Sequence, residues 1–137
     1  MASFMLKGRE VPLIYTTYEM KQIQEEIAPL SRAISTVLGN NPDDPDGPGI
    51  FGTPEHLGAA GKLIRILGNA GLEEAGEAPD LTDKKVMRAL KPVELSAAVH
   101  ACLEAMNEGM ASEIPEKDEG PVDVTLEQMK KKDGKAD

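Results

Sequence analysis

The sequence contains few of the residue types on which catalytic or disulfide-stabilised proteins depend. Its 137 residues include one cysteine and no tryptophan, and only 3% of them are aromatic. A single cysteine cannot form an internal disulfide, which fits a reducing cytoplasm. The N-terminal MASFMLKGRE lacks the apolar run of a signal peptide, and no apolar run is long enough to span a bilayer. We therefore expect no membrane partner.

Positive charge is also scarce. Fifteen lysines and arginines stand against 24 acidic residues, which gives a formal net charge of −9 at pH 7. This charge repels nucleic-acid phosphates, so we predict no nucleic-acid partner. It also keeps a protein soluble and favours basic partners.

The hydrophobic residues make up 40% of the chain. A chain of this length forms one domain and buries roughly two-thirds of its unfolded surface. With so few aromatics, the core must consist of leucine, isoleucine, valine, methionine and alanine. The seven methionines predict soft, adaptable packing.

Residues 3–15 predict a short β-hairpin. Phe4 and Leu6 alternate before a turn at Lys7-Gly8, and apolar residues alternate again over 11–15. Pro12 cannot donate a ladder hydrogen bond, so its strand should lie at an edge.

The first predicted helix begins at a capping box formed by Thr16 and Glu19. We expect Pro29 to kink or restart the helix, and a second stretch carries Ile34. The proline- and aspartate-rich segment 39–49 predicts a loop. The apolar stripe of the first helix consists of Met20, Ile23, Ile27 and Leu30.

The third predicted helix begins with Thr53 as its N-cap and Pro54 in its first turn, and we expect Gly68 and Gly71 to end it. Its buried stripe consists of Leu57, Ala60, Ile64 and Leu67.

Two further helices follow a polar linker. Thr82 caps a short helix, and Pro92 opens an amphipathic helix over roughly 92–108 that Gly109 could end. The expected fold is therefore mainly α, a bundle of four or five helices with a short N-terminal β-hairpin and a flexible C-terminal tail.

The composition divides the chain into a helical body, 1–112, and a tail, 113–137. The tail has eight acidic and five basic residues and few apolar ones. Ordering it costs on the order of 1–2 kcal/mol per residue, with little apolar surface to bury in return. We expect the tail to be mobile or loosely docked in the free protein and to order when it binds.

The chemistry-bearing residues form no recognisable catalytic or metal-binding set. We expect His56 and His100 to be solvated and Cys102 to be an unreactive core residue. HLGAAGK (56–62) lacks the first glycine and the final Ser/Thr of a phosphate-binding loop, and DDPDG (43–47) lacks the calcium-loop pattern. These residues predict neither an enzyme nor a bound metal or cofactor.

The order of three stretches is similar to that of a known family. KGREVPL leads into TTYEMKQIQEE, a later helix runs AVHACLEAMNEGMASE, and VDVTLEQMKKK follows near the C-terminus. The chain resembles, over nearly its whole length, the tail assembly chaperones of long-tailed phages and prophages, especially those of Gram-positive hosts.

The resemblance implies a non-enzymatic protein of the host cytoplasm that binds the apolar tape measure protein during tail tube assembly and is absent from the mature virion. The tail tube protein is a possible further partner, and weak homo-oligomers are possible. Many members also have a longer form made by programmed ribosomal frameshifting, for which Lys130–Lys132 or Gly134-Lys135 would be the site.

Such a role needs a soft apolar groove in which methionines adapt to varied surfaces. The candidate partner-binding residues lie on the first helix, on the last helix and in the tail. They are Met20, Ile23, Ile27, Leu103, Met106, Met110, Val122, Val124, Leu126 and Met129.

Two other functions remain open at this point. The chain would also suit a structural tail completion or connector protein of the virion, which should persist in purified particles. A small acidic regulatory protein, for example one that mimics nucleic-acid charge, is the third hypothesis. The neighbouring genes would separate it from the first, because a tape measure gene immediately downstream favours the chaperone.

Overall fold

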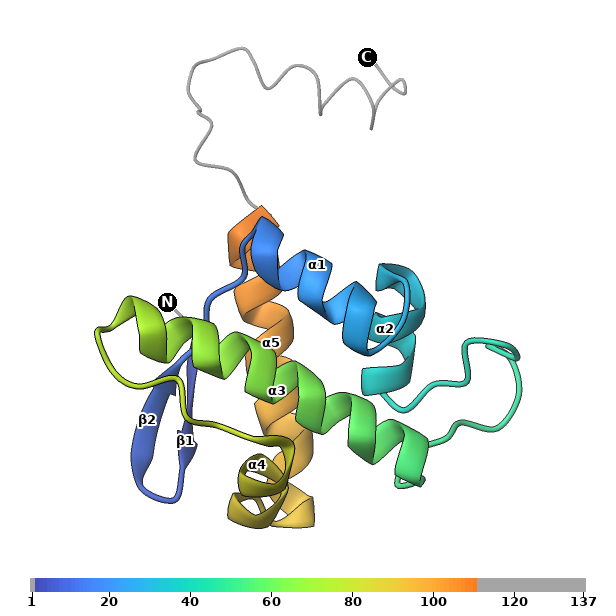
Figure 1. The fold of residues 1–137 in the computed structure, drawn as a ribbon. Helices are drawn as coiled ribbons and strands as arrows, with labels where there is room; N and C mark the ends of the chain where they lie inside the picture. Colours follow the sequence, from blue (N-terminus) through green and yellow to red (C-terminus); the bar gives the residue numbers. More distant parts are fainter. Residues whose placement is uncertain (1, 111–137) are drawn as a thin grey trace.

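A computed structural model describes residues 2–110, which form five α-helices and a two-stranded antiparallel hairpin (Figure 1). The mainly helical fold with an N-terminal hairpin is thus confirmed. The predicted tail, 113–137, lies outside the described residues. The elements are β1 (Ser3–Leu6), β2 (Arg9–Pro12), α1 (Thr17–Glu26), α2 (Leu30–Val37), α3 (Pro54–Glu74), α4 (Asp83–Ala89) and α5 (Pro92–Met110).

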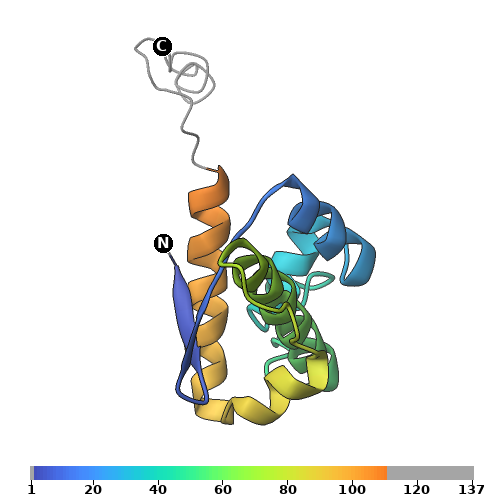
Figure 2. The ribbon, with the colours of Figure 1, turned by 60° about the vertical axis from the view of Figure 1, so that its left-hand side comes forward.

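The hairpin forms where the alternation predicts it. Phe4 pairs with Val11, and both side chains are buried. Lys7 and Gly8 make the turn with φ values of 53° and 80°, the left-handed conformation that two-residue hairpin turns require. The hairpin packs through β1 against α5 and through β2 against α3, beside the long axis of α5 (Figure 2).

The capping box predicted for α1 is present. Oγ1 of Thr16 accepts from the backbone N–H of Tyr18 at 3.2 Å, and Oε1 of Glu19 accepts from the backbone N–H of Thr16 at 2.9 Å. A new helix begins after Pro29, as predicted, since α1 ends at Glu26 and α2 begins at Leu30.

Helix α3 is the centre of the molecule, and α1, α2, α4, α5 and β2 all pack against it. It continues through Gly68 and Gly71, so the prediction that these glycines end the helix was wrong. Both glycines are buried, and a Cβ atom on Gly71 would lie 1.8 Å from the carbonyl oxygen of Pro12. Gly71 brings the backbone of the hairpin close to α3, and Gly68 makes room for the side chains of Leu81 and Val11. This packing outweighs the low helix propensity of glycine.

Gly109 allows a similar close backbone approach at the end of α5. The helix runs through Gly109 to Met110, beyond the predicted boundary. A Cβ atom on Gly109 would lie 2.3 Å from the carbonyl oxygen of Tyr15. The segment that joins β2 to α1 therefore rests directly on α5.

Tyr15, Ile23 and Cys102 belong to one continuous hydrophobic cluster that also includes residues of the hairpin and of all five helices. Among the helices of residues 2–110, none combines the length and the apolar character that crossing a membrane requires.

Arg65 on α3 connects α1 with α4. Its Nε–H donates to Oδ1 of Asp83 at 2.6 Å, and its Nη2 donates to Oε1 of Glu26. The Arg65 hydrogen bond lowers the pKa of Glu26. Burial alone would raise the pKa of Asp83, but the hydrogen bond and charge of Arg65 lower it overall.

We expect Arg65→Met to reduce the free energy of unfolding by about 1 kcal/mol at pH 7, because the side chain of Arg65 is only 16% exposed while its partners are partly screened by water. Ionised Glu26 and Asp83 stabilise the fold above their ordinary pKa values of 4.5 and 3.8, and this contribution is lost as the pH falls through their lower folded-state values. The difference between wild type and variant should therefore disappear on acidification. Urea titrations between pH 7 and pH 2.5 measure it.

The matched control is Lys21→Met, which breaks an exposed pair with Glu25 on α1. It should change stability by less than about 0.5 kcal/mol at any pH. A pH-independent loss in Arg65→Met would show that the arginine acts through its apolar stem and not through its charge.

Candidate functional site

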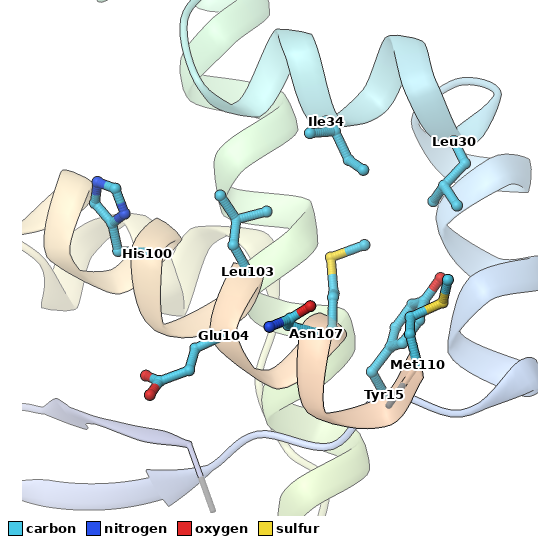
Figure 3. Close-up of a pocket in the computed structure, with 9 residues that line it drawn as sticks. Tyr15, Leu30, Ile34, His100, Leu103, Glu104, Asn107 and Met110 are labelled. Atoms are coloured by element: carbon cyan, nitrogen blue, oxygen red, sulfur yellow. The ribbon is translucent and has the colours of Figure 1, made fainter. Parts of the chain in front are cut away.

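An apolar groove lies between α2 and α5, with a volume of about 600 Å³ (Figure 3). We call it the α2–α5 groove. Its lining residues are Tyr15, Leu30, Ile34, His100, Leu103, Glu104, Met106, Asn107 and Met110.

The groove exists because α2 and α5 pack on α3 from different directions and leave a gap between themselves. Leu30 and Ile34 are one turn apart on α2 and face the groove from one side, while Leu103 faces them from α5. Met110 and Tyr15 stand at one end, and His100 stands at the other (Figure 3). The walls are therefore aliphatic side chains and thioethers, which accept varied apolar shapes.

The predicted residues of the last helix meet in this groove. Leu103, Met106 and Met110 all line it, and their spacing places them on one face of α5. Met110 is 61% exposed, so its side chain is available to a partner. Met106 is nearly buried and forms part of the floor.

The predicted residues of the first helix do not line the groove. Ile23 is 1% exposed and is a core residue, and Met20 and Ile27 are half-buried against the same core. Their stripe packs against α3, because α1 lies across that helix. Leu30, the one member of the predicted stripe that lines the groove, belongs to α2, and Ile34 lies one turn further along the same helix.

Four predicted residues cannot be placed. Val122, Val124, Leu126 and Met129 lie outside the described residues.

Tyr15 is a groove residue that the sequence did not single out. Its alternation with Val11 and Leu13 predicted only a buried side chain, and its side chain is indeed buried. Its hydroxyl is buried without a hydrogen-bond partner among residues 2–110. Burial raises the pKa of this hydroxyl, so it remains a neutral donor at physiological pH.

The polar groups of the groove lie at its rim. Glu104 and His100 are exposed on α5, and Glu104 points away from α2 (Figure 3). Glu104 is the one carboxylate among the lining residues, and no lysine or arginine lines the groove. The solvated state predicted for His100 is confirmed.

The same prediction was wrong for His56, which is 1% exposed. Its Nδ1 accepts from the backbone N–H of Gly52 at 3.0 Å, and its ring centroid lies 4.6 Å from that of Phe51. The imidazole therefore anchors the loop that precedes α3, as a structural side chain with its acceptor satisfied.

The prediction for Cys102 is confirmed in its burial, since the residue is 0% exposed. Burial raises the pKa of its thiol well above the ordinary range, so the nucleophilic thiolate is strongly disfavoured. Within residues 2–110, no three histidine, cysteine or acidic side chains lie together as a metal site would require.

Smaller hollows lie elsewhere on the described residues, and two of them differ in character from the α2–α5 groove. One, of about 320 Å³, lies near the start of α5 and is lined by apolar residues that include the exposed Phe51 and Met87. The other, of about 420 Å³, lies at the hairpin turn and α4 and is rich in lysine and arginine. Arg9, one of these cations, pairs with Glu77 and Asp80, so part of this charge is compensated within the fold.

Comparisons of the chain with protein-family models, with curated proteins and with solved structures gave no match.

Proposed function

We propose that this protein is a phage tail assembly chaperone that binds apolar helical segments of the tape measure protein and keeps them soluble while the tail tube assembles. It acts in the host cytoplasm and is absent from the finished virion. The tail tube protein is a further partner in this proposal, and copies of the chaperone associate weakly along the client.

The α2–α5 groove is the observation that carries the proposal. Its volume of about 600 Å³ lies in the range of sites that take up several side chains, and its walls are apolar with polar groups at the rim. An amphipathic helix binds such a groove by inserting apolar side chains spaced three or four residues apart. The flexible thioethers of Met106 and Met110 suit a client whose apolar stripe varies along its length.

The charge of the chain supports the same role. A tape measure helix exposes apolar stripes in water and tends to aggregate. A bound protein with a net charge of −9 would make the complex repel other copies and stay in solution.

The proposed role is non-enzymatic. The groove presents His100 and Glu104 at its rim, but none of its lining residues is a serine, threonine or cysteine that a base there could activate. The cysteine of the chain is buried in the core. An apolar binding surface is therefore a better account of the groove than a reaction centre.

Co-expression with the tape measure protein encoded nearby tests the proposal. We expect the tape measure protein to be largely insoluble alone and to be recovered as a soluble complex with this chain. Mass spectrometry of purified virions should detect the tape measure protein and not this chain. An equally insoluble tape measure protein without a recoverable complex would refute the chaperone role, and persistence of the chain in virions would favour a structural tail component.

A further inference from the structure

The hydroxyl of Tyr15 is a polar group without a partner at the end of an apolar groove. Its side chain is 6% exposed, and no atom of residues 2–110 forms a hydrogen bond with it. A buried donor that lacks an acceptor costs on the order of 1–3 kcal/mol, and native proteins rarely leave one unpaired. This arrangement indicates an occupant that brings both apolar side chains and a hydrogen-bond acceptor.

The chain itself continues from this groove. Met110 is the last residue described, and it lines the groove beside Tyr15. The 27 residues that follow include the segment 122–129, with an apolar residue at four of its eight positions. They are Val122, Val124, Leu126 and Met129.

We propose that residues 122–129 of the same chain bind in the α2–α5 groove of the free protein and offer a backbone or side-chain oxygen to the hydroxyl of Tyr15. The segment is then an internal competitor that a client must displace, and this second step rests on the proposed function.

The chain between Met110 and Val122 is short, so even a weak contact would keep the segment in the groove for much of the time. Eleven residues separate Met110 from Val122. A chain of that length has a root-mean-square span of roughly 17–20 Å, enough to turn back on the groove from which it leaves. Tethers of this kind give effective concentrations in the millimolar range, on the order of 1 mM, so a contact of millimolar affinity is already about half occupied.

The segment itself carries Asp123 and Glu127, so a charge attraction to the groove comes from the lysines that follow it. The segment is followed directly by Lys130–Lys132, while the groove has Glu104 at its rim and no lysine or arginine to repel them. This attraction orients the segment and is weakened by salt.

The test uses the full chain with a nitroxide attached at Asp133→Cys. Native Cys102 is fully buried and should not react, which labelling of the wild type verifies. We expect paramagnetic broadening of backbone amide signals at Leu30, Ile34 and Leu103, and little at the hairpin turn. The broadening should persist on dilution.

Two variants in the labelled chain identify the contact. Leu126→Asp with Met129→Asp should reduce the broadening in the groove at least tenfold, because two apolar side chains are replaced by charges. The matched control, Thr125→Asp with Gln128→Asp, adds the same charges beside the apolar residues. It should leave most of the paramagnetic broadening in the groove unchanged. Tyr15→Phe should lower the equilibrium constant for docking about fivefold through loss of one hydrogen bond, which reduces a half-docked population about threefold.

Several results would overturn the inference. Absent or uniform broadening, or broadening that the Leu126 and Met129 changes leave intact, would exclude this segment as the occupant. Broadening seen only when nitroxide-labelled chains are mixed with isotope-labelled ones would place a second copy in the groove. An unchanged signal in Tyr15→Phe would refute the hydrogen bond to the hydroxyl.

A client titration separates this inference from the function on which its second step rests. If the tape measure protein binds, it should release the segment, and the Leu126 and Met129 changes should tighten client binding two- to tenfold. Self-docking without client binding would refute the chaperone role alone. Client binding with no self-docking would refute the proposal that residues 122–129 compete with the client, and would leave the chaperone role intact.

Discussion

Met110→Asp is expected to weaken binding of the tape measure protein at least thirtyfold. Met110 is 61% exposed at one end of the α2–α5 groove, so it contributes little to the fold but much to a surface that a client would cover. Burying a methionine contributes roughly 1.5–3 kcal/mol, and placing an unpaired carboxylate in the covered groove adds a desolvation cost. Titration of a soluble tape measure fragment, followed by calorimetry, measures the change.

The matched control is Val93→Asp on the same helix. Val93 is 83% exposed in the first turn of α5, away from the groove, and an acidic side chain is favourable at a helix N-terminus. This variant makes the same change of charge and should bind within twofold of wild type. Equal affinities for the two variants, with both chains folded, would exclude the α2–α5 groove as the client site.

The local structure of this chain follows from neighbouring residues and was predictable for that reason. The turn at Lys7-Gly8 and the capping box at Thr16 depend on contacts within a few residues of the chain. The restart at Pro29 depends on one residue that cannot continue the helix before it. Each of these rules requires no knowledge of what lies elsewhere in the fold.

The errors arose where a distant part of the chain decides the outcome. Gly68 and Gly71 would end an isolated helix, but in α3 they make room for Leu81 and for the backbone at Pro12. His56 is a different case, because its hydrogen-bond partner Gly52 is only four residues away and the loop that covers the imidazole has no regular pattern. The distant partners of the two glycines cannot be recognised from the residues on either side of them.

The sequence predicted the α5 side of the groove but not the α2 side, for the same reason. The spacing of Leu103, Met106 and Met110 marks one face of α5, and all three line the groove. The stripes of α1 and α2 are both apolar at helical spacing, and only the packing on α3 decides that Ile23 enters the core while Ile34 remains at the groove. Sequence periodicity identifies a buried face but does not identify what covers it.

Gly71→Ala is expected to lower the free energy of unfolding by at least about 3 kcal/mol, a large share of the stability of a single domain. The added Cβ would lie 1.8 Å from the carbonyl oxygen of Pro12 and 2.4 Å from its carbon, and both are backbone atoms that cannot rotate away. The hairpin must therefore move off α3, which disturbs the 3.3 Å hydrogen bond from the N–H of Ile14 to the carbonyl of Leu67. Urea unfolding followed by circular dichroism measures the loss.

Gly58→Ala, in the same helix, is expected to raise the free energy of unfolding slightly. A Cβ at Gly58 meets no atom within 4 Å, and alanine favours the helix over glycine by roughly 0.5–1 kcal/mol. This variant should therefore be slightly more stable than wild type. Both substitutions replace glycine by alanine in the same helix, so they gain the same helix propensity. Only Gly71→Ala creates a clash with the hairpin, and opposite changes in the free energy of unfolding would therefore be due to that clash. If both variants were stabilised, the hairpin would not pack closely against α3 at Gly71.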